Sequence, residues 1–444
     1  MPAPTPLRPP ALAGLRAAGP WLAPALAFAL AFAIRLWWVR HFIVAPYGDQ
    51  PSLEAYAANV AHGLAYGTRG AYWPPAFVFL AGLVERLCGT GHAFLAVRTA
   101  NAVQGALACA LAADVARRLA RSAAAGLVAG LALALYGPAI YYTDTFLGAT
   151  LETATLIAAC DAVLAYGERP GAWRLGLAGA LLGLAALTKP TELPLLVPAF
   201  VHWGLRGRRG FDLRFAGRSA LAALGIALLI IAPWSWRNLR VTGSPVLIDT
   251  NGGVNFYIAH NPRATGLWMD LGDADPVLTP GGGYARPATD RLAFDAGWAW
   301  FVAHPAQDAR QAAGILRRFW TEPDGDIAQY GDGLRPIEAS LHVPLLDFSA
   351  LRDLAVLGLV LLLPSGPRGR HFLPLLVLGY PAGLALLFFA PRFRLPLCPL
   401  LAVAAGGGLV RLWLWWRQEW ALAHPPECAP EPLLRRPRDR AIGA

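Results

Sequence analysis

The sequence predicts an all-α protein that crosses a membrane many times. Of its 444 residues, 56% are hydrophobic and only 15% are charged, and the mean hydropathy is +0.43. This composition favours lipid over water as the solvent, and its apolar content excludes a disordered chain. Several apolar runs also reach the length of about 20 residues that a helix needs to cross the hydrocarbon core.

Ten such runs are candidate transmembrane helices, which gives about ten spans. They cover residues 20–41, 94–116, 123–143, 146–167, 173–188, 190–205, 217–236, 350–364, 371–390 and 395–416. The first run follows Arg8 and Arg16 and has no clear small-residue cleavage site. It is therefore predicted to be a retained signal anchor with its N-terminus in the cytoplasm of a multi-pass inner-membrane protein.

An eleventh apolar stretch, residues 73–88, is predicted to lie on the outer membrane surface. It is short, begins with Pro74 and Pro75, and carries Glu85 and Arg86 near its end. Leaving it out of the span count places the short arginine-rich loops on the cytoplasmic side, as the positive-inside rule requires. The net charge of +10 then follows from topology. Nucleic-acid binding, which needs one basic face, is not predicted.

The same topology divides the chain into parts with different environments. We expect an N-terminal transmembrane module with a first outer loop, a mixed extracytoplasmic loop domain, C-terminal transmembrane helices and a basic cytoplasmic tail. Their bounds are 1–236 with the outer loop at 42–93, 237–349, 350–416 and 417–444.

No metal site is predicted from the spacing of the usual ligands. The five cysteines are widely spaced and form no CxxC pair, and the nine histidines show no HExxH pattern. No cofactor is certain from the sequence, and a divalent metal is left open.

Three acidic residues near the outer ends of spans are candidate catalytic residues. A carboxylate at a lipid boundary is costly to desolvate and is typically retained for function. Asp49 follows the first span and could equally be the N-cap of the next helix. Asp144 and Glu152 lie two helical turns apart on one face. The alternative for Glu152 is an ion pair with a buried arginine such as Arg98.

Four cations at the same outer level suggest a site for an anionic head group. They are Lys189, Arg237, Arg392 and Arg394. Arginine suits bidentate phosphate binding, although each of these cations alone is more typical of an interfacial anchor. Arg392 and Arg394 flank Phe393, so in an extended turn both guanidinium groups would point to one side. The sequence therefore predicts that they bind one phosphate together.

The order of several short motifs resembles the GT-C type polyprenyl-phosphate-sugar glycosyltransferases, those similar to dolichyl-phosphate-mannose protein mannosyltransferases. The resemblance begins at Gly48-Asp49 and Trp73-Pro74-Pro75, continues through Lys189-Pro190 and Arg237-Asn238, and ends at residues 392–396. It is sharpest at Thr250–Tyr257 (TNGGVNFY), followed by Asn261-Pro262. Asn251, Asn255 and Asn261 are therefore candidate substrate-loop residues.

The resemblance implies a GT-C-like fold and an inverting glycosyltransferase. Such an enzyme would move a sugar from a polyprenyl-phosphate donor to a glycan, lipid or protein acceptor, at the outer face of the cytoplasmic membrane and in contact with membrane lipids. Asp49 inherits the catalytic role, and either Asp144 or Glu152 the supporting one. Gln50 departs from the family pattern, in which many relatives carry a second acid, and so does Lys189, where arginine is usual. The alternative function is a transporter or flippase for a lipid-linked or anionic substrate, which would predict inverted repeats.

Overall fold

The computed structural model describes residues 19–44, 46–66, 71–205, 210–272, 275–278, 286–322, 324, 345–362 and 371–423. Within these residues the chain forms helices and two isolated β-bridges, and no longer strand, which confirms the all-α fold class. Several arginines that set the predicted topology lie outside the described residues: Arg8, Arg16, Arg206, Arg208, Arg209, Arg368 and Arg370. The same holds for the tail from residue 424.

Each of the ten predicted spans coincides with a helix or a short series of helices. These are α2 (Leu22–His41), α5 (Ala93–Ala120), α6 (Ala123–Ala134) with α7 (Gly137–Tyr141), α8 (Ala149–Glu168), α9 (Ala172–Thr188), η3 (Pro190–Leu195) with α10 (Leu196–Gly204), α11 (Leu213–Thr242), α18 (Phe348–Leu362), α19 (Phe372–Leu384) and η5 (Pro391–Leu397) with α20 (Cys398–Ala423). Among the described residues, five helical segments are long and apolar enough to cross a membrane by themselves. The figure of about ten spans therefore stays a prediction.

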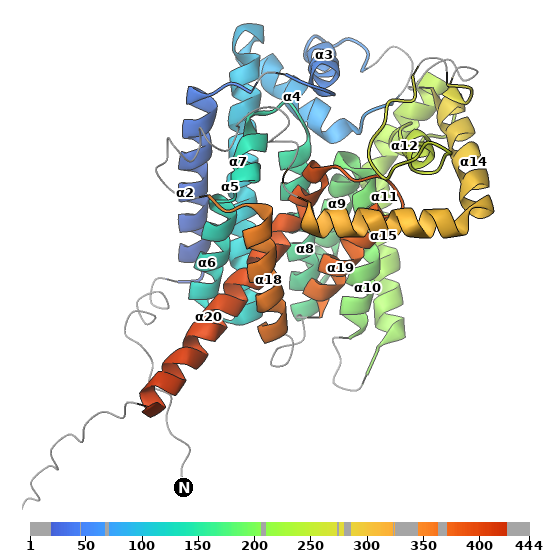
Figure 1. The fold of residues 1–444 in the computed structure, drawn as a ribbon. Coiled ribbons are helices and arrows are strands. Elements are labelled where there is room, and N and C mark those ends of the chain that lie inside the picture. The colour runs from blue at the N-terminus through green and yellow to red at the C-terminus, as the bar shows by residue number, and fades with distance from the viewer. Residues whose placement is uncertain are drawn as a thin grey trace, which may run out of the picture.

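Two helices of the first outer loop cover one end of the bundle. They are α3 (Gln50–Ala61) and α4 (Pro75–Cys88), which pack on each other, and α4 also packs on α5 (Figure 1). With only 14 residues, α4 is shorter than a membrane span. Its position at the end of the bundle fits the interfacial helix that the sequence predicts at 73–88.

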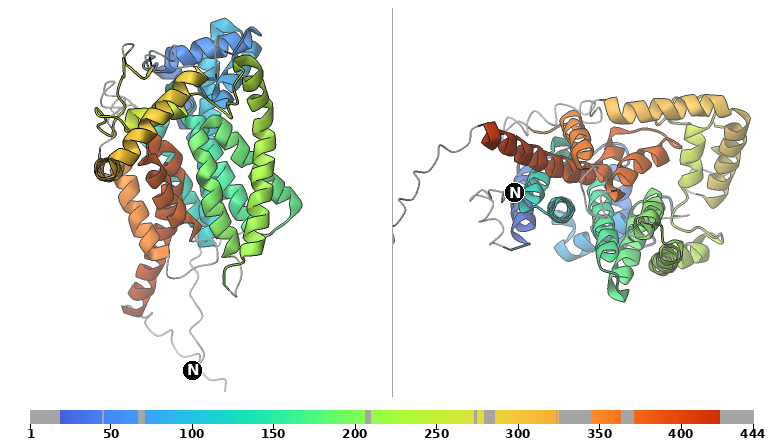
Figure 2. Two further views of the ribbon diagram at one scale, coloured as in Figure 1. Left: turned by 90° about the vertical axis from the view of Figure 1, so that its right-hand side faces the viewer. Right: turned by 90° about the horizontal axis from the view of Figure 1, so that it is seen from below.

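The described part of the predicted loop domain contains three helices and irregular segments between them. The helices are α12 (Gly252–Ala259), α14 (Pro287–Ala303) and α15 (Pro305–Thr321), which project to one side of the bundle (Figures 1 and 2). Helix α11 continues past the predicted domain boundary at 237. No helix-breaking residue follows Pro233 until Gly243, which ends α11 with a φ of 67°.

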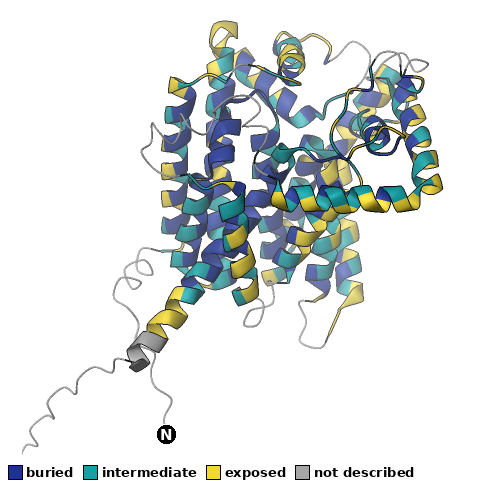
Figure 3. Ribbon diagram, in the orientation of Figure 1, coloured by how far each residue is buried: buried dark blue, intermediate teal, exposed yellow. Residues whose placement is uncertain are grey.

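The bundle is held together by close helix contacts through small residues. Buried residues lie where the helices face one another, and exposed residues lie on the outer faces (Figure 3). At the contact between α18 and α20, a Cβ added to Gly358 would come within 2.0 Å of the Ala404 carbonyl oxygen. Apolar packing in lipid depends on such close approach, because burial from water supplies little driving force there.

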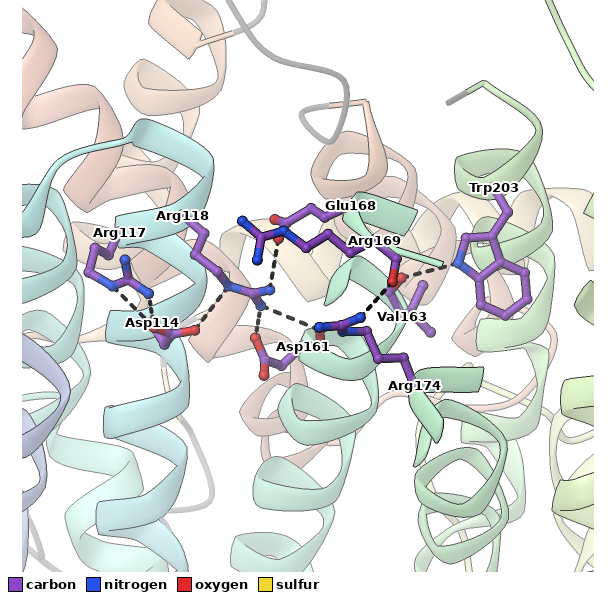
Figure 4. A network of polar contacts seen from close by, with 9 residues as sticks. All are labelled: Asp114, Arg117, Arg118, Asp161, Val163, Glu168, Arg169, Arg174 and Trp203. Carbon is purple, nitrogen blue, oxygen red and sulfur yellow. Dashed lines mark hydrogen bonds and ion pairs between the residues drawn. The ribbon is translucent and has the colours of Figure 1, made fainter. Parts of the chain in front are cut away.

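Ion pairs tie α5 to α8 at the end of the bundle opposite α3 and α4. Arg118 of α5 contacts Asp161 and Glu168 of α8, and it is also paired with Asp114 one turn earlier (Figure 4). Arg118 lies in the last turn of α5, whose carbonyl end attracts cations. The network therefore fixes this end of the two helices relative to each other.

The predicted topology can be tested by labelling single cysteines from outside intact cells. A cysteine at Asp295 of α14 should react, whereas one at Asp212, before α11, should not. Labelling of Asp212→Cys from outside would mean that residues 73–88 cross the membrane, and the assignment of the outer face would then be reversed.

Candidate active site

A cavity of about 280 Å³ lies between the first outer loop, the bundle and the loop domain. Six of the ten predicted site residues line it: Asp49, Glu152, Lys189, Asn251, Asn255 and Arg392. They come from five parts of the chain, namely the start of α3, the start of α8, the end of α9, the start of α12 and η5. The fold thus gathers charged residues that are more than 300 positions apart at the extremes, such as Asp49 and Arg392.

Asp49 lies at the N-cap position of α3, but its side chain caps nothing. The carboxylate is 38% exposed, and its Oδ2 is 3.2 Å from Nη2 of Arg392. Gly48 precedes it with a φ of 55°, a left-handed conformation that glycine adopts without strain. The backbone therefore starts a helix at Asp49 while leaving the carboxylate free to face the cavity.

A second ion pair crosses the cavity between Glu152 and Lys189. Glu152 is in the first turn of α8, and its Oε2 is 3.1 Å from Nζ of Lys189, which follows the last residue of α9. Nζ of Lys189 also lies 4.1 Å from the centre of the Phe393 ring, and the Arg392 guanidinium carbon lies 5.6 Å from the same centre. The two ion pairs are therefore neighbours that share one aromatic contact.

Asp144 does not line the cavity. It is fully buried, forms an ion pair with Arg98 and accepts a hydrogen bond of 2.6 Å from the Val44 amide. Arg98 also donates to the Phe42 carbonyl. The partner of Arg98 is therefore Asp144 rather than Glu152, and this pair holds the segment that leads from α2 to Asp49.

Arg394 also lies away from the cavity, fully buried between α15, α18 and α20. It donates to the carbonyls of Arg318, Phe319 and Glu322 at 2.6–2.7 Å, and it is paired with Asp324 at 3.2 Å. The extended turn that would align it with Arg392 is wrong, because residues 391–397 form a 3-10 helix. With three residues per turn, side chains two positions apart point in different directions.

Arg237 and Asn261 are the other predicted residues outside the cavity. The Arg237 guanidinium carbon lies 4.7 Å from the centre of the Trp234 ring and 5.3 Å from that of Tyr66. Asn261 is buried and donates to the carbonyls of Tyr257 and Ile258 at the end of α12. Both positions indicate packing and capping roles near the site.

The second glycine of the Asn-Gly-Gly motif, Gly253, lies at a close approach between helices. A Cβ on Gly253 would lie 1.9 Å from the carbonyl oxygen of Asp290 in α14. The amides of Gly253 and Val254 also donate to Oδ1 of Asp290, at 2.6 and 3.2 Å. A carboxylate at this helix N-terminus is favoured by the helix dipole. The start of α12, which carries Asn251 and Asn255, is therefore fixed against α14.

Residues that the sequence did not single out also line the cavity. Aromatic and aliphatic side chains form much of its wall: Leu53, Tyr72, Trp73, Phe77, Leu147, Trp268, Leu384, Leu387 and Phe388. Asp249 lines it as well, and burial raises the pKa of its carboxyl to about 7. The sequence feature that could have identified Asp249 as a site residue is its position directly before the Thr250–Tyr257 motif. Among the described residues, no group of three or more potential ligands could hold a metal.

Comparisons with known proteins support the resemblance seen in the sequence. Residues 73–236 match the family described as dolichyl-phosphate-mannose-protein mannosyltransferase. No curated protein matches the chain.

Two solved structures are similar over most of the chain. One is ArnT from Cupriavidus metallidurans bound to undecaprenyl phosphate, with 16% identity and a TM-score of 0.53, covering 90% of this chain and 62% of that one. Another is the oligosaccharyltransferase AglB from Archaeoglobus fulgidus in complex with an inhibitory peptide and a dolichol-phosphate, with 14% identity and a TM-score of 0.54, covering 92% of this chain and 52% of that one. The chain thus spans between half and two thirds of the length of these proteins, and the shared feature is the fold.

The different environments of Arg392 and Arg394 can be tested by comparing the thermal stability of their alanine variants. Arg394→Ala should markedly lower the thermal stability of the purified protein, because it leaves three buried carbonyls and Asp324 without their partner, a loss of about 3 kcal/mol or more. Arg392→Ala should leave the melting temperature nearly unchanged, because this side chain is partly exposed. Equal melting temperatures for the two variants would contradict the structural role of Arg394.

Proposed function

We propose that this chain, which has the GT-C fold, is a glycosyltransferase that uses a polyprenyl-phosphate sugar. It transfers the sugar with inversion to a hydroxyl of a glycan, lipid or protein, at the outer face of the cytoplasmic membrane. The observation that supports this most is the cavity, in which two carboxylate–cation pairs are set among apolar and aromatic walls. The neighbours bound to undecaprenyl phosphate and to dolichol-phosphate share this fold and add support.

Asp49 is the proposed catalytic base. It is the most exposed carboxylate of the two ion pairs that cross the cavity, and it lies in the first outer loop. It takes the proton of the acceptor hydroxyl as that oxygen attacks the anomeric carbon. The bond from that carbon to the phosphate oxygen breaks on the opposite face, and its electron pair stays with the phosphate.

Arg392 and Lys189 are the proposed phosphate ligands. Charge-assisted hydrogen bonds from cations stabilise the negative charge that grows on the leaving phosphate. Leu384, Leu387 and Phe388 continue the cavity wall next to these cations and suit the first isoprene units of the lipid. Glu152 is the proposed supporting acid, since it holds Lys189 in place, whereas Asp144 acts as a structural residue.

The two ion pairs imply an order of binding. Arg392 holds Asp49, and Lys189 holds Glu152, until a phosphate competes for both cations. Binding of the glycosyl donor therefore releases Asp49 from its ion pair and leaves the carboxylate available to the acceptor. The donor is expected to bind first.

Changing Asp49 to Asn should abolish transfer and strengthen phosphate binding. Without the competing carboxylate, undecaprenyl phosphate should bind about two- to fivefold more tightly, because a partly exposed ion pair contributes up to about 1 kcal/mol. Binding is measured on the purified protein in lipid nanodiscs, and transfer by following the membrane glycolipids. The gain in affinity should vanish in the Asp49→Asn, Arg392→Ala double variant. Near-normal turnover by Asp49→Asn would refute the assignment of the base.

Glu152→Gln and Asp144→Asn separate the two candidate supporting acids. Glu152→Gln should reduce transfer by about tenfold or more with little change in melting temperature, because it frees Lys189 in the cavity. Asp144→Asn should lower the melting temperature, because it leaves Arg98 buried without a counter-charge. A folded Asp144→Asn protein with a larger loss of turnover than Glu152→Gln would reverse the two roles.

A further inference from the structure

Asp249 differs from the other two carboxylates of the cavity. Asp49 and Glu152 are each paired with a cation, whereas Asp249 has no ion-pair partner among the described residues. Its carboxyl accepts a hydrogen bond from the backbone amide of Asn251. A carboxylate in a cavity wall without a cation is costly, and such a group is retained where its chemistry is used.

The backbone on both sides of Asp249 is tightly held. The Ile248 carbonyl accepts hydrogen bonds from Nε1 of Trp234 at 2.6 Å and from Nδ2 of Asn238 at 3.0 Å. The Thr250 amide donates to the Ala71 carbonyl at 2.9 Å. These contacts tie the segment to α11 and to the first outer loop, so Asp249 keeps its place in the wall whether or not a ligand is present.

The charges around Asp249 disfavour its ionised form. Burial raises the pKa of the Asp249 carboxyl most, the hydrogen bond from the Asn251 amide lowers it, and the negative charge of Asp290 in α14 raises it again, to about 7. Tyr66 is nearby: burial raises the pKa of its phenol and the charge of Asp249 contributes, while the Arg237 guanidinium carbon lies 5.3 Å from the centre of its ring. The other charged groups that line the cavity are Asp49, Glu152, Lys189 and Arg392, which are paired with one another. A bound phosphate would add a further negative charge, which also favours the protonated carboxyl.

We propose that Asp249 is a further ligand of the glycosyl donor, and that its protonated carboxyl donates a hydrogen bond to an anionic oxygen of the sugar phosphate. This inference rests on the proposed function. The phosphate would then be bound by two cations, Arg392 and Lys189, and by one neutral acid, Asp249. Ionisation of Asp249 would convert an attractive contact into a repulsion between two anions.

The sign of the pH dependence follows from the raised pKa. Below about pH 7 the carboxyl is protonated and can donate; above this value the protonated fraction falls by about tenfold per pH unit. Affinity for the phosphate should therefore be full in mild acid and decrease in alkaline solution. Asparagine at this position has an NH₂ group that donates and does not ionise, so Asp249→Asn should bind equally well at both pH values.

The test uses undecaprenyl methyl phosphate, a diester whose single charge is constant between pH 6 and pH 8.5. Binding is measured on the full-length protein in nanodiscs of uncharged lipid. The wild-type protein should lose about tenfold or more in affinity over this range, and Asp249→Asn should change by less than about twofold. Asp290→Asn keeps an oxygen for the α12 amides but removes a charge that raises the pKa of Asp249, so its pH dependence should persist and move to lower pH.

Two results separate this inference from the proposed function. Parallel pH dependence in wild type and Asp249→Asn would overturn the role of Asp249 and leave the glycosyltransferase proposal intact. Absence of binding in all proteins at both pH values would overturn the proposed function, and the inference with it. Loss of the pH dependence in Asp290→Asn alone would assign the titration to Asp290 and also overturn the inference.

Discussion

The buried guanidinium of Arg394 is the contact on which the geometry of the cavity depends. It binds three carbonyls at the end of α15 and pairs with Asp324, while its guanidinium carbon lies 4.2 Å from the centre of the Phe348 ring. It therefore joins the loop domain to α18 and to the start of α20. Because η5 is a tight 3-10 helix, fixing Arg394 also fixes Phe393 and Arg392, which come one and two residues earlier. It thereby places the Arg392 guanidinium in the cavity.

Charge pairing then decides which residues stay available to a ligand. Arg98, Arg118 and Arg394 each satisfy buried or half-buried partners and stabilise the fold. Arg392 and Lys189 have carboxylate partners in pairs that are partly accessible to solvent, which is why we propose these two cations as the phosphate ligands. Partners that solvent can reach thus distinguish the proposed binding residues from the buried structural ones.

The sequence predicted the helical class, the positions of the helices at the ten candidate spans and six of the residues that line the cavity, because apolar run length and local motifs carry this information. It did not separate Arg392 from Arg394, since their directions depend on a 3-10 turn that the motif does not encode. It left Asp144 and Glu152 undecided, since the partner of Arg98 is set by packing between α5 and the turn before α8. Asp249 was missed because its environment comes from Asp290 and Ala71, both far along the chain.

The pairs that join α5 to α8 have a mechanical consequence. Arg98 forms an ion pair with Asp144, which precedes α8. Arg118 forms ion pairs with Asp161 and Glu168 near the other end of that helix. Ion pairs near both ends hold α5 and α8 rigidly together. Tilting one of these helices relative to the other would break the pairs at both ends and leave their charges unpaired. A transporter mechanism in which α5 and α8 rock against each other is therefore disfavoured. The partly exposed side chains of Asp49 and Arg392 are the parts that can still adjust to a ligand.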